Sequence, residues 1–141
     1  MSQEKDGKER AMPKHGEICW TEVATTNLDQ IDAFYTSLFG WKIKSDKNAE
    51  FEYRHFEDGR GEDVGGMYEM NPEMFGGHAV PPPHFMTYIA VDDVDLAVEK
   101  AKNMGAEVQR EPMDIPGTGR MAVIKDPLGA VFAVITLTGG K

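Results

Sequence analysis

A pattern of strand, helix cap, helix and glycine occurs twice in this chain and constrains its fold more than any other feature. Asn27 and Asp93 each follow a half-apolar run that alternates like a strand. Gly40 and Gly105 each end the amphipathic run that comes next. An offset of 66 residues places Asn27 on Asp93, and the two glycines agree with that register to within one residue. Such internal repetition indicates one structural unit used twice.

Each repeat contains one predicted helix. Asn and Asp are favoured N-caps because their side chains accept a backbone N–H bond, and glycine is the usual residue after a helix end. Apolar residues recur at helical spacing in both runs: Leu28, Ile31, Phe34, Tyr35 and Leu38 in the first, and Val94, Ala97, Val98 and Ala101 in the second. We therefore predict helices over residues 28–39 and 94–104.

The segments around these helices read as strands. A strand is expected before each helix, over residues 17–25 and 84–91, and three more after it, over residues 41–44, 51–57 and 63–70 in the first repeat and 106–110, 120–125 and 130–137 in the second. Residues 111–119 read as a loop. Residues 71–83 contain three consecutive prolines and are expected to be a linker without helix or central strand.

The chain therefore reads as two βαβββ modules, about 15–70 and 84–138, after a disordered tail at residues 1–14. A module with one helix covers only one face of its sheet. Two modules side by side predict an α+β fold with a curved eight-stranded mixed sheet, a central groove and helices outside.

Charge and composition exclude several functions. The chain has 15 basic and 24 acidic residues and a net charge of −9, which disfavours binding to nucleic acid or an anionic membrane. Its single cysteine excludes an intrachain disulfide. It has no apolar run of about 18 residues, and its charged first residues do not resemble a secretory signal. We expect a soluble, cytoplasmic protein.

Several motifs, in order along both repeats, match one family: Trp20-Thr21-Glu22, Thr25-Thr26-Asn27-Leu28, Leu38-Phe39-Gly40-Trp41, Tyr88-Ile89-Ala90-Val91-Asp92-Asp93-Val94 and Asp126-Pro127-Leu128-Gly129. Over residues 15–138 the chain resembles the vicinal-oxygen-chelate superfamily, which holds glyoxalase I, bleomycin-resistance proteins and extradiol dioxygenases. It looks most like the lactoylglutathione-lyase-related subgroup, many of whose members have no assigned reaction. The resemblance implies a small-molecule ligand and a homodimer.

The resemblance also implies a divalent metal ion, held by His, Glu or Gln from the first and last strand of each module. The first-strand positions carry Trp20 and Met86, and the last-strand position of the second module falls near Ala133. Indole and methyl groups cannot bind a hard divalent ion, and methionine sulfur prefers soft metals. The fourth position falls within residues 67–69, where only Glu69 is a suitable donor. We expect neither metal nor other cofactor, with a metal site through Glu69 as the alternative.

Strand alternation predicts which side chains line the groove. Trp20 and Glu22 share a face, and Met86 and Tyr88 are their repeat partners. Cys19, Thr21 and Val23 should face the helix. The residues expected to contact a ligand are Trp20, Glu22, Met67, His84, Met86, Tyr88 and Ala133. Such a cavity is mostly apolar and aromatic, which is typical of small-molecule sites.

Glu22 and Tyr88 are the candidate catalytic residues. A carboxylate in an apolar groove is costly unless it is paired, and such groups often act as general bases. Tyr88 could donate a hydrogen bond or a proton. The structural alternative is that Glu22 pairs with Tyr88, Arg54 or Arg120. His55 lies within a strand, where a bonded or exposed histidine is more common than a ligand.

Three functions remain open. The first is a metal-free protein that binds a small, partly apolar molecule. The second is an enzyme of the lyase, isomerase or dioxygenase type that uses Glu22 and Tyr88 or an unrecognised metal site. The third is an interaction module that docks another protein.

Overall fold

The computed structural model describes residues 12–46 and 51–138, so most of the expected tail at residues 1–14 lies outside the described residues. The described chain packs as two compact units. The first unit consists of residues 20–85. The second consists of residues 86–138 together with the segment before residue 20. Both follow the predicted βαβββ order, which confirms the α+β class. No helix among the described residues is long and apolar enough to cross a membrane.

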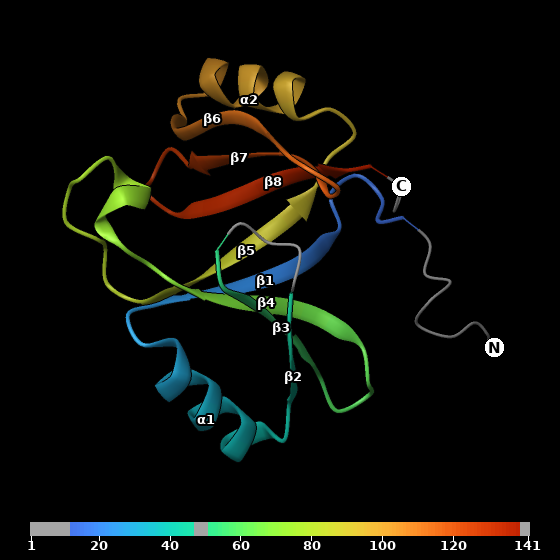
Figure 1. Ribbon diagram of the computed structural model, residues 1–141. Coiled ribbons are helices and arrows are strands. Elements are labelled where there is room, and N and C mark those ends of the chain that lie inside the picture. The colour runs from blue at the N-terminus through green and yellow to red at the C-terminus, as the bar shows by residue number, and fades with distance from the viewer. Residues whose placement is uncertain (1–11, 47–50, 139–141) are drawn as a thin grey trace. The chain divides into compact units, whose positions relative to one another are not determined.

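The elements of the first unit are β1 (Ile18–Thr25), whose first two residues group with the second unit, α1 (Leu28–Phe39), β2 (Lys42–Ser45), β3 (Tyr53–Glu57) and β4 (Asp63–Glu69) (Figure 1). Its four strands lie in the order β2-β3-β4-β1, in which β1 and β4 run parallel and the other neighbours run antiparallel.

The ends of α1 agree with the sequence prediction. Asn27 accepts a hydrogen bond from the Gln30 N–H through its side chain (3.0 Å). Gly40 takes a left-handed conformation with φ 74°, and its N–H donates to the Thr36 carbonyl. These contacts satisfy backbone groups that a helix end leaves unpaired, so α1 begins and ends at the predicted residues.

The core of the first unit lies between its sheet and α1. Its buried members are Val23, Leu28, Phe56 and Met67. The Trp41 ring stacks on Phe56 with centroids 4.1 Å apart. Val23 therefore faces α1, as alternation predicted.

The prediction that Met67 lines the groove is wrong. Met67 is 0% exposed and belongs to the core under α1. The physical reason is strand register: Met67 pairs with Val23 in the parallel β1–β4 ladder, and directly paired residues share a face. The neighbours of Met67 on β4, Gly66 and Tyr68, occupy the opposite face instead.

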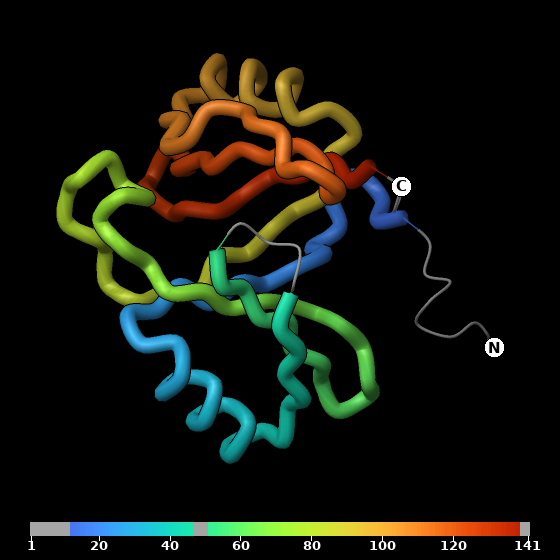
Figure 2. Tube along the Cα trace, viewed as in Figure 1, coloured from blue at the N-terminus to red at the C-terminus, as the bar shows by residue number. Residues whose placement is uncertain are grey.

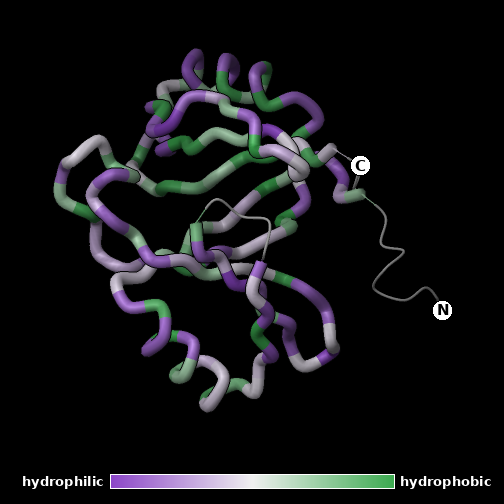
Figure 3. Tube along the Cα trace, in the orientation of Figure 1, coloured by the Kyte–Doolittle hydropathy of each residue, from purple (hydrophilic) through white to green (hydrophobic). Residues whose placement is uncertain are grey.

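The second unit repeats this plan. Its elements are β5 (His84–Ala90), whose first two residues group with the first unit, α2 (Val94–Asn103), β6 (Glu107–Ile115), β7 (Gly119–Lys125) and β8 (Val131–Leu137). Its strand order is β5-β8-β7-β6, with β5 and β8 parallel. The helix α2 lies over β6, β7 and β8 (Figure 1), and β7 and β8 are drawn largely in hydrophobic green (Figure 3). The buried core consists of Val94, Val98, Ala122, Ile124 and Val134.

Strand β6 differs from its prediction. Instead of a short strand and a loop at residues 111–119, it continues to Ile115 and forms a hairpin with β7 (Figure 2). The pairing shifts register twice, between Val108 and Arg110 and between Arg110 and Met113. Such bulges add unpaired residues and break the period-2 pattern, so alternation could not reveal the second half of this edge strand.

The linker after β4 also holds more structure than expected. One 3₁₀ turn, Pro72–Phe75, is capped by the Asn71 side chain, which accepts from the Met74 N–H (3.2 Å). The prediction that residues 71–83 contain no helix is therefore wrong for these four residues. Proline is tolerated in a first helical turn because its missing N–H would have no partner there, and Gly76 ends the turn with φ 66°.

The predicted turn between β7 and β8 is present. The Gly129 N–H donates to the Asp126 carbonyl (3.0 Å). The Asp126 carboxylate accepts from the N–H groups of Ala130 (3.0 Å) and Leu128 (2.9 Å). These backbone bonds hold the pKa of Asp126 below its ordinary value.

This depressed pKa predicts a pH dependence. A carboxylate with a lowered folded-state pKa contributes stability above its unfolded pKa of about 4, and the contribution is lost as pH falls through the folded value. The stability difference between the wild type and Asp126→Asn should therefore be constant above about pH 5 and shrink below about pH 4. Urea unfolding at several pH values measures it. A constant difference down to pH 3 would contradict the assignment.

Candidate functional site

Polar and aromatic side chains gather on the face of the first unit's sheet that points away from α1. In the ladders, Glu22 and His55 both pair with Gly66, and Tyr53 pairs with Tyr68. Paired residues share a face. We call this surface the site face; its members are Trp20, Glu22, Tyr53, His55, Gly66 and Tyr68. The side-chain-bearing members are half-buried.

A directed chain of hydrogen bonds crosses the site face. The Trp20 indole Nε1–H donates to the Tyr53 hydroxyl oxygen (3.1 Å). The Tyr53 hydroxyl donates its single proton to Glu22 Oε2 (2.8 Å). Hydrogen bonds that end on an ionised acceptor are stronger than neutral ones. These two hydrogen bonds therefore stabilise the negative charge of Glu22 and fix the direction in which its carboxylate points.

Neither arginine proposed as a partner of Glu22 is available to it. Arg54 lies on the α1 side, where it pairs with Asp29 and Asp32, each at 2.7 Å. Arg120, in the second unit, pairs with Asp95 at 2.8 Å, and its guanidinium holds the pKa of that carboxyl below its usual value. The sequence reading missed Tyr53 as a partner of Glu22. Alternation along residues 53–57 indicates only the side of the strand on which Tyr53 lies, and its pairing with Glu22 has no signal in the local sequence.

Gly66 is needed for this arrangement. A Cβ atom at residue 66 would enter the space of the Tyr53 phenol. The aromatic ring therefore lies directly over the backbone of β4, an approach that a glycine permits. This close contact places the Tyr53 hydroxyl between Trp20 and Glu22.

Aromatic rings extend the site face. Tyr53 and Tyr68 stack with centroids 6.5 Å apart and an interplanar angle of 23°. Phe51 meets both rings edge-on, at 6.1 Å and 5.7 Å. Phe51 is 48% exposed, so the cluster presents aromatic surface to solvent.

Two carboxylates lie beside the ring of His55. Its Nε2 atom lies 3.1 Å from Asp46 Oδ2, and its Nδ1 atom lies 3.5 Å from Asp63 Oδ2. Trp20 contacts the ring edge-on at 5.6 Å. The Nε2 contact is a hydrogen bond within the structure, which agrees with the structural interpretation of this histidine, whereas Nδ1 is buried without a hydrogen-bond partner among the described residues.

The metal positions can now be assigned more closely. In the second unit Ala133 pairs with Tyr88, and in the first Gly66 pairs with Glu22. Since Glu22 and Tyr88 are related by the 66-residue repeat, Gly66 is the counterpart of Ala133. The four positions that the resemblance marks for ligands are therefore Trp20, Gly66, Met86 and Ala133.

This set does not fit a hard divalent ion, because indole, glycine and methyl groups supply no suitable donor and a thioether is soft. The alternative through Glu69 is not supported: its carboxylate lies on the α1 side and accepts a hydrogen bond from the Leu28 N–H (2.9 Å). Within residues 12–46 and 51–138 no group of three His, Cys, Asp or Glu side chains could hold a metal ion.

The other predicted ligand contacts are distributed over the two units. His84 makes a hydrogen bond with the Pro82 carbonyl (2.7 Å), within the segment that leads into β5. In the second unit Met86 is half-buried, Tyr88 is 8% exposed and Ala133 is fully buried beside Tyr88 in the β5–β8 ladder. Their contact with a ligand stays a prediction.

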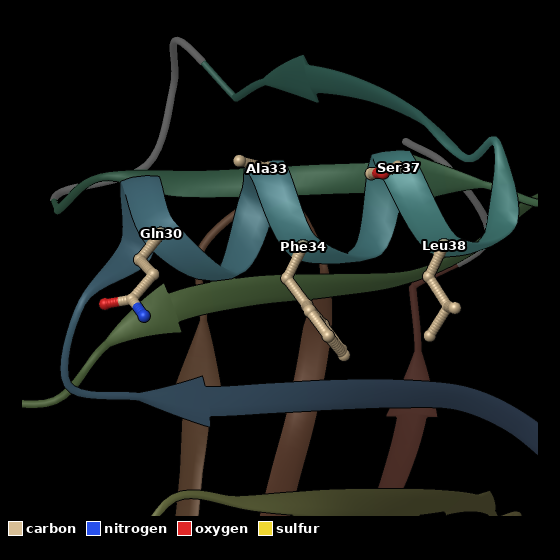
Figure 4. A pocket seen from close by; sticks show the side chains of 5 residues that line it. All are labelled: Gln30, Ala33, Phe34, Ser37 and Leu38. Atoms are coloured by element: carbon tan, nitrogen blue, oxygen red, sulfur yellow. The ribbon is translucent and has the colours of Figure 1, made fainter.

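A surface depression of about 470 Å³ lies elsewhere, on α1. Its lining consists of Gln30, Ala33, Phe34, Ser37 and Leu38 (Figure 4). Phe34 and Leu38, which belong to the apolar run at helical spacing, are 53% and 58% exposed. Residues of one helix line it, and none is charged. The site face is the better candidate because polar groups converge on it.

A family model agrees with this architecture. The model of the glyoxalase/bleomycin resistance protein/dioxygenase superfamily matches residues 17–134. The chain belongs to this superfamily. A further similarity is to "Putative glyoxylase CFP32" of Mycobacterium tuberculosis, with 40% identity over 121 residues, which cover 85% of this chain and 44% of that protein. "Anthracycline biosynthesis protein DnrV" of Streptomyces peucetius is 33% identical over 84% of this chain and 46% of its own length. The chain thus spans less than half the length of these two relatives.

Two solved structures share the fold of this chain. Methylmalonyl-CoA epimerase from Mycobacterium tuberculosis matches with a TM-score of 0.61 at 13% identity, over 94% of this chain and 96% of that chain. The H200Q variant of homoprotocatechuate 2,3-dioxygenase from B. fuscum matches with a TM-score of 0.60 at 17% identity, over 92% of this chain and 34% of that chain. At these identities the likeness concerns the fold alone.

Proposed function

We propose that this superfamily member binds a small, partly apolar molecule on the site face, without a metal ion of the family type. One observation carries the proposal: a polar chain from Trp20 through Tyr53 to Glu22 is set among aromatic rings. A few fixed polar groups in apolar surroundings are typical of ligand sites. The names of the relatives, a glyoxylase and an anthracycline biosynthesis protein, also belong to small-molecule chemistry.

An enzyme is the second candidate, of the lyase, isomerase or dioxygenase type. The Tyr53–Glu22 hydrogen bond at 2.8 Å favours it, because a carboxylate held by a phenol can accept a proton from a ligand. In this reading Glu22 is the base, Tyr53 orients it, and Tyr88 remains the proposed acid. The chain covers less than half the length of its longer relatives, so this candidate rests on the chain's own residues.

An interaction module is the third candidate, and the exposed Phe34 and Leu38 side chains on α1 favour it.

We also propose that the chain is a homodimer in the cytoplasm, and sedimentation of the purified protein measures its mass in solution.

The test combines metal analysis with ligand binding. Purified protein is assayed for Ni, Zn, Fe and Mn, and then screened by thermal shift against small aromatic molecules with and without a chelator. We expect less than about 0.1 metal ion per chain and ligand-induced shifts that the chelator leaves unchanged. Stoichiometric metal that is lost together with binding would overturn the metal-free proposal.

The hydrogen bond from Tyr53 to Glu22 should make a measurable contribution to the free energy of unfolding. Tyr53→Phe should lower the free energy of unfolding by about 1–2 kcal/mol, because it removes a bond to an ionised acceptor. Tyr35→Phe is the matched control, since no hydrogen bond of the Tyr35 hydroxyl to described residues is present, and it should change stability by less than about 0.5 kcal/mol. Equal effects in urea unfolding would contradict the role of Tyr53.

A further inference from the structure

Two donors of the site face, on Trp20 and Tyr53, are used within its own network. The Trp20 N–H is directed at Tyr53, and the Tyr53 O–H at Glu22. An ionised carboxylate is an acceptor with about four lone-pair sites, so it can accept from a ligand as well as from Tyr53. What this network can offer a ligand is acceptor capacity, and a ligand that donates a hydrogen bond complements it.

The charges of the site face point the same way. Strand alternation and the contacts of His55 place four carboxylates on or beside it: Glu22, Asp46, Glu57 and Asp63. Lys42 and Lys44 are the cations that the β2–β3 pairing places on this face, and Lys44 pairs with Glu57 at 3.2 Å, so the four carboxylates outnumber the lysines. Arg54 is held on the other side of the sheet by Asp29 and Asp32. An anionic ligand would meet an excess of negative charge.

The aromatic cluster sets the shape. Phe51, Tyr53 and Tyr68 are in mutual ring contact, and Phe51 is half-exposed. Aromatic side chains favour offset or edge-to-face contact with another ring. A flat, apolar ligand would use this surface while its polar edge reaches Glu22.

From these three features we infer that the site face selects an uncharged, planar aromatic molecule with a hydroxyl group, which donates to Glu22. The inference rests on the proposed function and narrows its ligand class. It disfavours anionic ligands such as carboxylates and phosphorylated thioesters on this face, for reasons that lie in the chain's own residues.

Three naphthalenes with one ring system test the inference: 2-naphthol, which donates, 2-methoxynaphthalene, which does not, and 2-naphthoate, which is an anion. Calorimetric titration at pH 7 should give 2-naphthol an affinity at least about tenfold higher than 2-methoxynaphthalene, as expected for a hydrogen bond to a charged group. The 2-naphthoate ion should bind more weakly still.

Glu22→Gln gives the sharpest variant, because its amide can both accept and donate. It should cut the preference for 2-naphthol to less than about threefold and should raise the affinity for 2-naphthoate. Glu99→Gln, an exposed position on α2, makes the same change in net charge and should leave the preference intact. If Glu22→Gln fails to fold, the comparison of the three compounds on the wild type still tests the inference.

The outcomes separate the two proposals. If the three compounds bind the wild type equally, or 2-naphthoate binds best, the donor inference is overturned while small-molecule binding stands. If 2-naphthol is preferred and Glu22→Gln retains that preference, Glu22 is not the acceptor and the inference is wrong. If none of the three binds, the proposed function of this face fails together with the inference.

Discussion

Gly65→Ala is expected to destabilise the protein by about 3 kcal/mol, the upper part of the range for overpacked interiors. Neither Gly65 nor Gly66 has a positive φ, so backbone strain does not cause the expected destabilisation. The cause is space: a Cβ at residue 65 would meet the Thr21 carbonyl and the ring of Phe56. Thr21 pairs with Gly65 in the β1–β4 ladder, and Phe56 is 1% exposed. Neither neighbour can move without disturbing the sheet or the core.

Gly66→Ala is the matched control, because it makes the same change one residue along on the opposite face. Its Cβ would meet the Tyr53 ring, a half-buried side chain that can rotate away. We expect a loss of only about 1 kcal/mol, at the lower end of the range for overpacking, together with loss of ligand binding on the site face. Urea unfolding and ligand titration of both variants measure the contrast. Equal stability losses would show that β4 is not divided between core and site.

The repeat explains why so much of the fold could be predicted. Asn27 and Asp93 both cap helices as expected, through bonds to the N–H groups of Gln30 and Leu96. Caps and glycine stops are local chemistry, and a helix end depends on a few neighbouring residues. For the same reason the turn at Asp126 was predicted from its sequence alone.

Features that depend on register could not be predicted in the same way. The face of a residue on β4 depends on how that strand aligns with β1 and β3, and a shift of one residue moves each side chain to the other face. Met67 was misplaced for this reason. The bulges of β6 hid half of that strand in the same manner.

Tyr53 shows what local patterns leave out. It lies 31 residues from Glu22 and 33 from Trp20 along the chain, yet it joins them in space. The contact depends on Gly66, on a third strand, which leaves room for the ring. To predict a site built from three strands, the pairing of all three strands must be known. Alternation within a single strand predicts only the face on which each side chain lies.

Met67→Ala tests the corrected face of β4 directly. Truncation of a fully buried methionine removes apolar contacts and leaves a cavity, so we expect the free energy of unfolding to fall by about 2–5 kcal/mol. Met113→Ala, on β6, is the control. The Met113 side chain is 40% exposed, so Met113→Ala should lower the free energy of unfolding by less than about 1 kcal/mol.

Ligand binding separates the two positions proposed for Met67. Because Met67 packs with Val23 and Leu28 under α1, its truncation should leave the affinity for a site-face ligand unchanged under conditions where the variant is folded. A groove-lining methionine would behave in the opposite way, with weaker binding and little change in stability. Urea unfolding and calorimetric titration of the same preparation decide between them. Since Gly66 and Met67 are adjacent, the pair of variants maps the boundary between the packing side and the binding side of one strand.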